Sequence, residues 1–240
     1  MTLTLENVSR SFQTVTAIKQ INLTIKKGEV ICLLGKSGCG KSTLLRTLSG
    51  LDQEYSGKIY FEGTPLTGVR EEIGFIFQEP RLLPWLNVID NIQFGLKQND
   101  EQTSQRVHRF IQYVGLKGKE YIYPKALSGG MSQRAAIARA LVCDPEVLLL
   151  DEPFSALDHF TKLELQDLLL KIQAKYKTTM VMVTHDIDEA LYLADRIVVL
   201  SSQPGTIQQI VEVTQPRPRT RTSDGLKGLK EKILKTLHVE

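Results

Sequence analysis

A glycine-rich loop between an apolar run and a helix-forming segment constrains the fold of this chain most strongly. Val30–Leu34 is apolar throughout, as expected for a buried strand, and Thr43–Leu48 is typical of the start of a helix. Residues 35–42 between them fit the phosphate-binding pattern GxxxxGK[ST]. Because this pattern needs a strand before it and a helix after it, the segment predicts an α/β domain that binds a nucleoside triphosphate.

The residues of this loop have expected parts in holding the triphosphate. Backbone N–H groups can turn inward and surround the phosphates at the positive end of the following helix. The ammonium of Lys41 is expected to reach the β and γ phosphates, and the hydroxyl of Ser42 to bind Mg²⁺. Cys39 lies near Lys41 and a helix start, which favour the thiolate, so its thiol is predicted to be reactive and protected by ATP. The predicted nucleotide-binding residues here are Gly35, Lys36, Ser37, Gly38, Cys39, Gly40, Lys41 and Ser42.

A second apolar run ends in two acidic residues. Val147–Leu150 is expected to be a strand covered on both faces in a parallel sheet, and Asp151 and Glu152 follow it. Beside a phosphate loop, Asp151 is expected to hold Mg²⁺, and Glu152 to act as general base on the attacking water. Without the loop, such a run would more often be an ordinary solvated strand end.

Two further predicted strands end in residues suited to the same chemistry. Ile73–Phe77 is followed by Gln78, and Thr179–Thr184 by His185. Open parallel sheets bind ligands outside the carboxyl ends of their strands, so these residues are expected near the γ-phosphate. In other surroundings, such a glutamine or histidine would usually be a surface or capping residue. The predicted catalytic residues are Lys41, Gln78, Glu152 and His185, and the predicted Mg²⁺ ligands are Ser42, Gln78 and Asp151.

A second glycine motif lies well downstream of the first. Ser128-Gly129-Gly130 precedes Met131–Val142, an alanine-rich stretch that is strongly helix-forming. A serine hydroxyl and bare glycine amides at a helix start make an anion site, although an ordinary N-capped helix begins in the same way. One γ-phosphate cannot easily be held by two such sites of one fold. The second site is therefore expected to bind the ATP of another copy, so that ATP joins two subunits head to tail.

With these motifs together, the chain resembles the ATP-binding subunit of an ABC transporter over nearly all of its length. The resemblance implies a P-loop NTPase core with a parallel sheet, an amino-terminal antiparallel β subdomain and a helical subdomain that carries the signature. It also implies a cytoplasmic ATPase that dimerises around two ATP molecules, as a homodimer or with a closely related subunit. The motifs are Walker A at 35–42 with Thr43, the Q-loop at Gln78, the signature at Leu127–Gln133, Walker B at Val147–Asp151 with Glu152, the D-loop at Ser155–Asp158 and the switch histidine at His185.

The resemblance adds three predicted nucleotide contacts, Phe12, Gln133 and Asp158. Phe12 matches the aromatic residue that stacks on adenine in this family, although a phenylalanine near a strand is more often part of the core. Gln133 belongs to the signature and Asp158 to the D-loop.

Partners follow from the same resemblance. In the family, the region after Gln78 receives a short cytoplasmic helix of the transmembrane permease subunit, and here Leu82–Leu86 is apolar and contains Trp85, the only tryptophan. These residues would otherwise fill the helical lobe. The segment Gln78–Trp85 and the run Pro216–Arg219 are similar to those of prokaryotic importers of nitrate, sulfonate and taurine, which also use a substrate-binding protein. Importers of thiamine or riboflavin precursors, and ABC ATPases without a transporter, are the alternatives.

Length and pattern agree with one ATPase domain spanning 1–240, with a helical insertion at about 80–142 and a basic tail at about 216–240. Thr2–Val8 and Ile18–Ile25 alternate apolar and polar residues and are expected to be antiparallel strands. Gly57–Phe61 is expected to join them in the same sheet. In the tail, Leu226, Leu229, Ile233 and Leu237 recur at helical spacing, which favours packing on the chain's own domain over membrane binding.

Charge, cysteine content and hydropathy exclude several classes. The net charge is +3, and no basic stripe with interleaved aromatic residues argues for nucleic-acid binding. Three cysteines without CxxC spacing indicate a reducing compartment. No stretch approaches the roughly 18 apolar residues of a transmembrane helix, and no signal peptide is expected. The predicted location is therefore the cytoplasm, peripheral on the inner face of the cell membrane.

Overall fold

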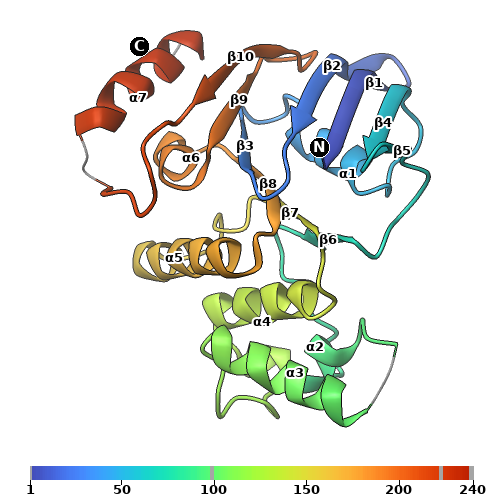
Figure 1. Ribbon diagram of the computed structural model, residues 1–240, viewed down its shortest axis with the longest axis vertical. Coiled ribbons are helices and arrows are strands. Elements are labelled where there is room, and N and C mark those ends of the chain that lie inside the picture. Colours follow the sequence, from blue (N-terminus) through green and yellow to red (C-terminus); the bar gives the residue numbers. More distant parts are fainter. Residues whose placement is uncertain (1, 98–99, 222–223, 238–240) are drawn as a thin grey trace. The chain divides into compact units, whose positions relative to one another are not determined.

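The computed structural model describes residues 2–97, 100–221 and 224–237 (Figure 1). The chain forms two compact units, one made of the residues up to Arg70 and from Lys177 on, the other of Glu71–Tyr176. Residues 222–223 and 238–240 of the predicted basic tail lie outside the described residues. None of the helices among the described residues has the length and apolar character needed to cross a membrane.

The first unit contains the antiparallel sheet that the alternating segments predicted. Its strand order is β2-β1-β4-β5, and β1 pairs with both β2 and β4. Leu5 lies opposite Leu23 on one side and Ile59 on the other, and all three side chains are buried. The strands are β1 (Leu3–Phe12), β2 (Val15–Ile25), β4 (Ser56–Phe61) and β5 (Thr64–Pro65).

A second sheet in this unit has the strand order β10-β9-β3-β8. β3 runs parallel to β8 and β9, and every residue of β3 and β8 is buried. For β3 this confirms the buried strand expected from its apolar run. Helix α7 packs against α6 and β10, as predicted for the apolar face of the tail (Figure 1). The elements are β3 (Val30–Leu34), α1 (Lys41–Leu48), β8 (Thr179–Thr184), α6 (Ile187–Leu193), β9 (Arg196–Leu200), β10 (Ile207–Glu212) and α7 (Asp224–Thr236).

The second unit joins a pair of parallel strands to most of the helices. It is wider than the predicted helical insertion, because it also contains β6, β7 and α5. Within it α4 contacts α2, α3, α5 and β6 (Figure 1). The elements are β6 (Ile73–Ile76), α2 (Val88–Gln93), α3 (Glu101–Tyr113), η1 (Pro124–Ala126), α4 (Gly129–Leu141), β7 (Val147–Asp151) and α5 (His159–Tyr176).

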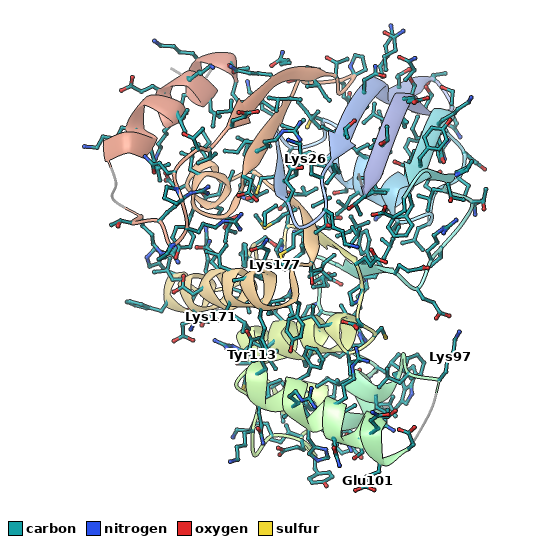
Figure 2. All side chains as sticks on the ribbon, in the orientation of Figure 1. Lys26, Lys97, Glu101, Tyr113, Lys171 and Lys177 are labelled. Carbon is teal, nitrogen blue, oxygen red and sulfur yellow. The ribbon has the colours of Figure 1, made fainter. Side chains whose placement is uncertain are left out.

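Local sequence explains where these helices begin and how they pack. Asp100 caps α3, since its carboxylate accepts a hydrogen bond of 2.7 Å from the N–H of Thr103. Val107, Phe110 and Ile111 of α3 recur at helical spacing and are buried. Tyr113, labelled in Figure 2, is the last residue of α3. Its ring lies 6.1 Å from that of Tyr176 in α5, and the Lys175 ammonium lies 4.6 Å from the Tyr113 ring.

Candidate nucleotide-binding site

The phosphate loop follows β3 and runs into α1, which begins at Lys41. Gly40, at the N-cap, has a left-handed φ of 94°, and a Cβ there would lie 2.6 Å from the carbonyl oxygen of Ala17. Only glycine fits this turn. The Lys41 ammonium is 5% exposed and donates hydrogen bonds of 2.8 Å to the Gly35 carbonyl and 3.0 Å to the Lys36 carbonyl. Lys41 therefore lies along the loop, where it is predicted to bind the phosphates of ATP.

The structure contradicts the expected reactivity of Cys39. Its side chain is 1% exposed, and its Sγ lies 3.9 Å from the Lys41 Nζ inside the loop. A reagent must reach the sulfur before any activation of the thiol matters. The sequence shows the nearby charge and the helix start, but it does not show that the sulfur of Cys39 is buried. The expected part of the Cys39 backbone in phosphate binding is unaffected by this correction.

The turn between β9 and β10 braces the outer side of the loop, which sequence reasoning missed. The Gln203 amide donates a hydrogen bond of 3.3 Å to the Gly38 carbonyl. Gly205 is held to β2 by two backbone hydrogen bonds of 2.9 Å, from its N–H to Ala17 and from the Lys19 N–H to its carbonyl. A Cβ on Gly205 would lie 2.1 Å from the Cys39 carbonyl oxygen. The only sequence signal was a Gln-Pro-Gly turn after an apolar strand.

His185 lies at the same sheet edge as the phosphate loop. β3 and β8 are parallel neighbours with Leu34 opposite Thr184, so Gly35 and His185 directly follow paired positions. His185 is exposed. The next residue, Asp186, caps α6 by accepting hydrogen bonds from the N–H groups of Asp188 (2.9 Å) and Glu189 (3.2 Å). The structure thus brings together the two predicted site elements of this unit.

Phe12 ends β1 and is not a core residue. Its ring is 46% exposed, and the Arg10 guanidinium lies 4.1 Å from the ring centroid. The expected contact of Phe12 with adenine stays a prediction.

In the second unit, the ends of β6 and β7 bring Gln78 and the two acids together. The strands are parallel with Ile76 opposite Leu150, so Gln78 and Asp151 end at the same edge. The Gln78 amide donates a hydrogen bond of 3.2 Å to the Ser155 hydroxyl, which donates one of 3.1 Å to the Glu152 carbonyl. Glu152 has a left-handed φ of 45°. This conformation costs about 1–2 kcal/mol in a residue with a Cβ, and such strain is concentrated at functional sites.

The signature motif forms the start of α4. The Ser128 hydroxyl accepts a hydrogen bond of 3.3 Å from the Met131 N–H, so the serine is an N-cap as well as a candidate ligand. Ser128 and Gly129 are exposed, whereas Gly130 is buried. A Cβ on Gly130 would lie 2.3 Å from Cγ2 of Thr161 in α5, so a larger residue there would have to displace the Thr161 side chain. The exposed amides at this helix start fit the predicted anion site.

Gln133 and Asp158 have different surroundings. The Gln133 side chain is 2% exposed, and its Nε2 has no hydrogen-bond partner among the described residues. The expected contact of Gln133 with a nucleotide held by another copy stays a prediction. Asp158 is exposed, and hydrogen bonds from the hydroxyl and from the N–H (3.1 Å) of Thr161 lower the pKa of its carboxylate.

The sequence pattern of the ABC transporter family matches residues 18–155, which include the phosphate loop, Gln78, the signature, Asp151 and Glu152. The chain belongs to this family. It is 48% identical over 238 residues to the aliphatic sulfonates import ATP-binding protein SsuB of Bacillus cereus, covering 98% of this chain and 95% of that protein. The SsuB 1 protein of Xanthomonas axonopodis pv. citri is 46% identical over 242 residues, covering 98% and 96%.

Solved structures of ABC proteins have the same fold as this chain. CbiO1 of Clostridium perfringens, part of the cbiONQ ABC transporter complex, superposes with a TM-score of 0.82 at 30% identity, covering 97% of this chain and 92% of that one. The ATP-binding cassette MJ0796, a dimer in a post-hydrolysis state bound to ADP and Pi, gives a TM-score of 0.78 at 30% identity, covering 89% and 100%. The chain is therefore an ABC transporter ATPase that binds and hydrolyses ATP.

Proposed function

We propose that this ABC ATPase powers the import of an aliphatic sulfonate, or of a closely similar small anion such as taurine or nitrate. One observation carries the substrate class: the similarity to sulfonate import proteins extends over 98% of the chain at 48% identity. The solute itself does not touch an ATPase subunit. The site therefore supports ATP hydrolysis as the energy source of transport, and the similarity over the whole chain supports the class of solute. Importers of thiamine or riboflavin precursors are the alternative that the test must separate.

In the proposed reaction, the phosphate loop of one subunit and the signature of another enclose each ATP. Lys41 neutralises charge on the β and γ phosphates, and His185 donates a hydrogen bond to the γ-phosphate. Glu152 takes a proton from the attacking water as general base. Ser128 and Gly129 of the second subunit supply hydroxyl and amide donors to the same phosphate. Hydrolysis then removes the bridge, and the two subunits separate.

The proposed metal ion is Mg²⁺, with Ser42, Asp151 and Gln78 as its protein ligands. Hydroxyl, carboxylate and amide oxygens are the hard donors that Mg²⁺ prefers, so the residues fit the ion. The described residues contain no group of three or more His, Cys, Asp or Glu side chains that could hold a metal. This agrees with an ion bound largely by phosphates and water, since Mg²⁺ in such sites takes one or two carboxylates from the protein. When bound, it would neutralise charge on the transferring phosphoryl group.

The proposed contact with the permease is an aromatic surface formed by Trp85, Tyr121 and Tyr123. Their side chains are 69%, 75% and 47% exposed, so Trp85 does not fill the helical lobe. The segment that carries the tyrosines lies against the start of α2, with a 3.0 Å hydrogen bond from the Val88 N–H to the Ile122 carbonyl. Exposed aromatic residues on a rigid support suit an amphipathic helix. Binding there would hold the ATPase on the inner face of the cell membrane.

Buried Asn91 holds the loop that presents Trp85. Its amide oxygen accepts a hydrogen bond of 2.8 Å from the Leu83 N–H, and its Nδ2 donates to the carbonyls of Leu83 (3.1 Å) and Leu86 (2.8 Å). The loop is therefore fixed before any partner arrives, which reduces the entropy lost on docking.

The test is transport by the complete complex in proteoliposomes, with its permease and substrate-binding protein. Uptake of a labelled alkanesulfonate should need ATP inside the vesicle and should be lost with Lys41→Ala, and unlabelled sulfonate should compete better than nitrate or a thiamine precursor. Uptake of nitrate or a thiamine precursor in preference to sulfonate would refute the substrate class. ATP hydrolysis that never couples to any uptake would indicate a non-transport ABC ATPase instead.

A further inference from the structure

A buried arginine of the carboxyl-terminal segment hydrogen-bonds to the end of the short helix α6. Arg219 is 7% exposed, and its Nη1 donates hydrogen bonds to the carbonyls of Leu191 (3.0 Å), Tyr192 (3.2 Å) and Ala194 (2.6 Å). These carbonyls lie at the helix end, where backbone oxygens lack partners within the helix. A guanidinium there donates hydrogen bonds to these carbonyls and interacts favourably with the negative end of the helix dipole.

The other polar atoms of this arginine fix it to its own segment. Its Nε donates to the Gln215 carbonyl (2.9 Å) and its Nη2 to the Val213 carbonyl (3.0 Å). The neighbouring arginines bind the same region of the unit. The Arg221 guanidinium lies 3.7 Å from the Tyr192 ring centroid, and Arg217 forms an ion pair with Asp195.

Helix α7 holds the other end of α6. The Lys230 ammonium lies 2.8 Å from each carboxylate oxygen of Asp188, in the first turn of α6. Helix α7 is itself anchored, because Leu226 and Ile233 are buried and the Thr236 hydroxyl donates a 2.6 Å hydrogen bond to Gln209 on β10. We call the side chains of Arg217, Arg219, Arg221 and Lys230 the carboxyl-terminal clamp.

The position of α6 bears directly on His185. The helix has seven residues and begins two positions after the histidine. The intervening Asp186 caps it, and the Asp186 N–H donates a 3.0 Å hydrogen bond to the Thr184 hydroxyl, which donates one of 2.5 Å to Glu189 in the helix. A shift of α6 would therefore move the turn that presents His185. The phosphate loop leads from β3 into α1 and is not part of this turn.

We propose that the carboxyl-terminal clamp positions His185 for hydrolysis by fixing both ends of α6. This inference rests on the proposed role of His185 at the γ-phosphate. Weakening the clamp then slows the chemical step and leaves ATP binding largely unchanged. Arg219 and Lys230 are positioning residues in this view, since they act on the reaction through α6.

The test measures steady-state ATP hydrolysis by the full-length chain carrying Arg219→Ala, Lys230→Ala, Lys230→Arg or Lys232→Ala. The first two should lower kcat at least fivefold with KM for ATP within twofold of wild type. Lys230→Arg keeps a cation opposite Asp188 and should restore most of the rate. Lys232→Ala removes an exposed lysine of the same helix and should leave kcat unchanged. Far-UV circular dichroism and Tm establish that each variant is folded.

A double-mutant cycle with His185→Ala separates this inference from the function on which it rests. If the clamp acts through the histidine, adding Arg219→Ala to His185→Ala causes no further loss of kcat. An equal loss in both backgrounds, or wild-type kcat in folded Arg219→Ala, overturns the positioning role. If Arg219→Ala does not fold, the Lys230 variants decide, and unchanged kcat in Lys230→Ala overturns it. Wild-type turnover by His185→Ala itself would instead refute the proposed role of the histidine.

Discussion

The turn that braces the phosphate loop provides a direct test of how the loop is shaped. In Gly205→Ala, the new Cβ would start 2.1 Å from the Cys39 carbonyl oxygen and 3.2 Å from that of Ala17. The shorter contact must lengthen by about 1 Å or more, since carbon makes unstrained contacts only beyond about 3 Å. Gly205 cannot simply retreat, because two backbone hydrogen bonds hold it to Ala17 and Lys19. Much of the displacement therefore falls on the loop.

We expect two measurable effects of Gly205→Ala. Overpacking of this kind costs about 1–3 kcal/mol of stability, to be measured as a lower denaturation midpoint. If most of this cost of about 1–3 kcal/mol falls on the phosphate loop, the Kd for ATP should rise by roughly one to two orders of magnitude, since about 1.4 kcal/mol corresponds to tenfold in Kd. Calorimetric titration of the purified chain measures that Kd. The loosened loop should also expose the Cys39 thiol to alkylation, scored in a Cys143→Ser background because Cys143 is the only exposed cysteine among the described residues.

Gly228→Ala is the matched control. Gly228 lies in α7, and a Cβ there meets no atom within 4 Å. Alanine should stabilise an exposed helix position by about 0.5–1 kcal/mol and leave the Kd for ATP unchanged. A folded Gly205→Ala protein whose Kd for ATP and Cys39 labelling both match wild type would refute the bracing of the loop by this turn.

Three further predictions concern other parts of the chain. Glu152→Gln should keep ATP binding, accumulate as an ATP-bound dimer in gel filtration and lose turnover by about 10²-fold or more, and normal turnover would remove Glu152 as the base. Trp85→Ala should reduce co-purification with the permease without changing the Kd for ATP, because the ring is 69% exposed, and unaltered co-purification would argue against the aromatic surface. The pKa of Asp100 is lowered by its hydrogen bonds to Thr103, so its charged form stabilises the fold above the ordinary Asp value and this contribution is lost as pH falls through the lower folded pKa. Asp100→Asn should therefore lose less stability than wild type between pH 7 and 3, and parallel Tm profiles would contradict this.

The sequence predicted strands most accurately where burial is complete. The limits of β8 and β3 agree with the predicted Thr179–Thr184 and Val30–Leu34. For β3 the reason is that its uninterrupted apolar run ends where the strand leaves the core. β1 extends to Phe12, beyond the predicted Val8, because backbone pairing continues through register shifts that break the alternation of side chains. Helix α1 begins at Lys41, two residues before the predicted start, because Gly40 already closes the loop as its N-cap.

Site residues were predictable where one short motif contains the whole chemistry. The phosphate loop, the signature and the acids at the end of β7 each carry their proposed function within a few residues. Gln203, Gly205 and Arg219 act instead through backbone atoms distant in the sequence, such as the Gly38 carbonyl, which lies 165 positions from Gln203. No local pattern can indicate such contacts. The error at Cys39 has the same origin, since the sequence specifies the neighbouring charge but not the packing that buries the sulfur.

The residues proposed to bind ATP and those proposed to hydrolyse it lie in different kinds of backbone surroundings. The phosphate loop has a fixed shape, because main-chain atoms pack directly on Gly40 and Gly205 and leave no room for a side chain. The proposed hydrolytic residues have other surroundings, since Glu152 adopts a left-handed backbone and His185 is exposed before a seven-residue helix. A strain of about 1–2 kcal/mol at Glu152 corresponds to a change of roughly 5- to 30-fold in conformer population. Changes to the backbone braces should therefore alter ATP affinity, and changes around Glu152 or α6 should alter kcat.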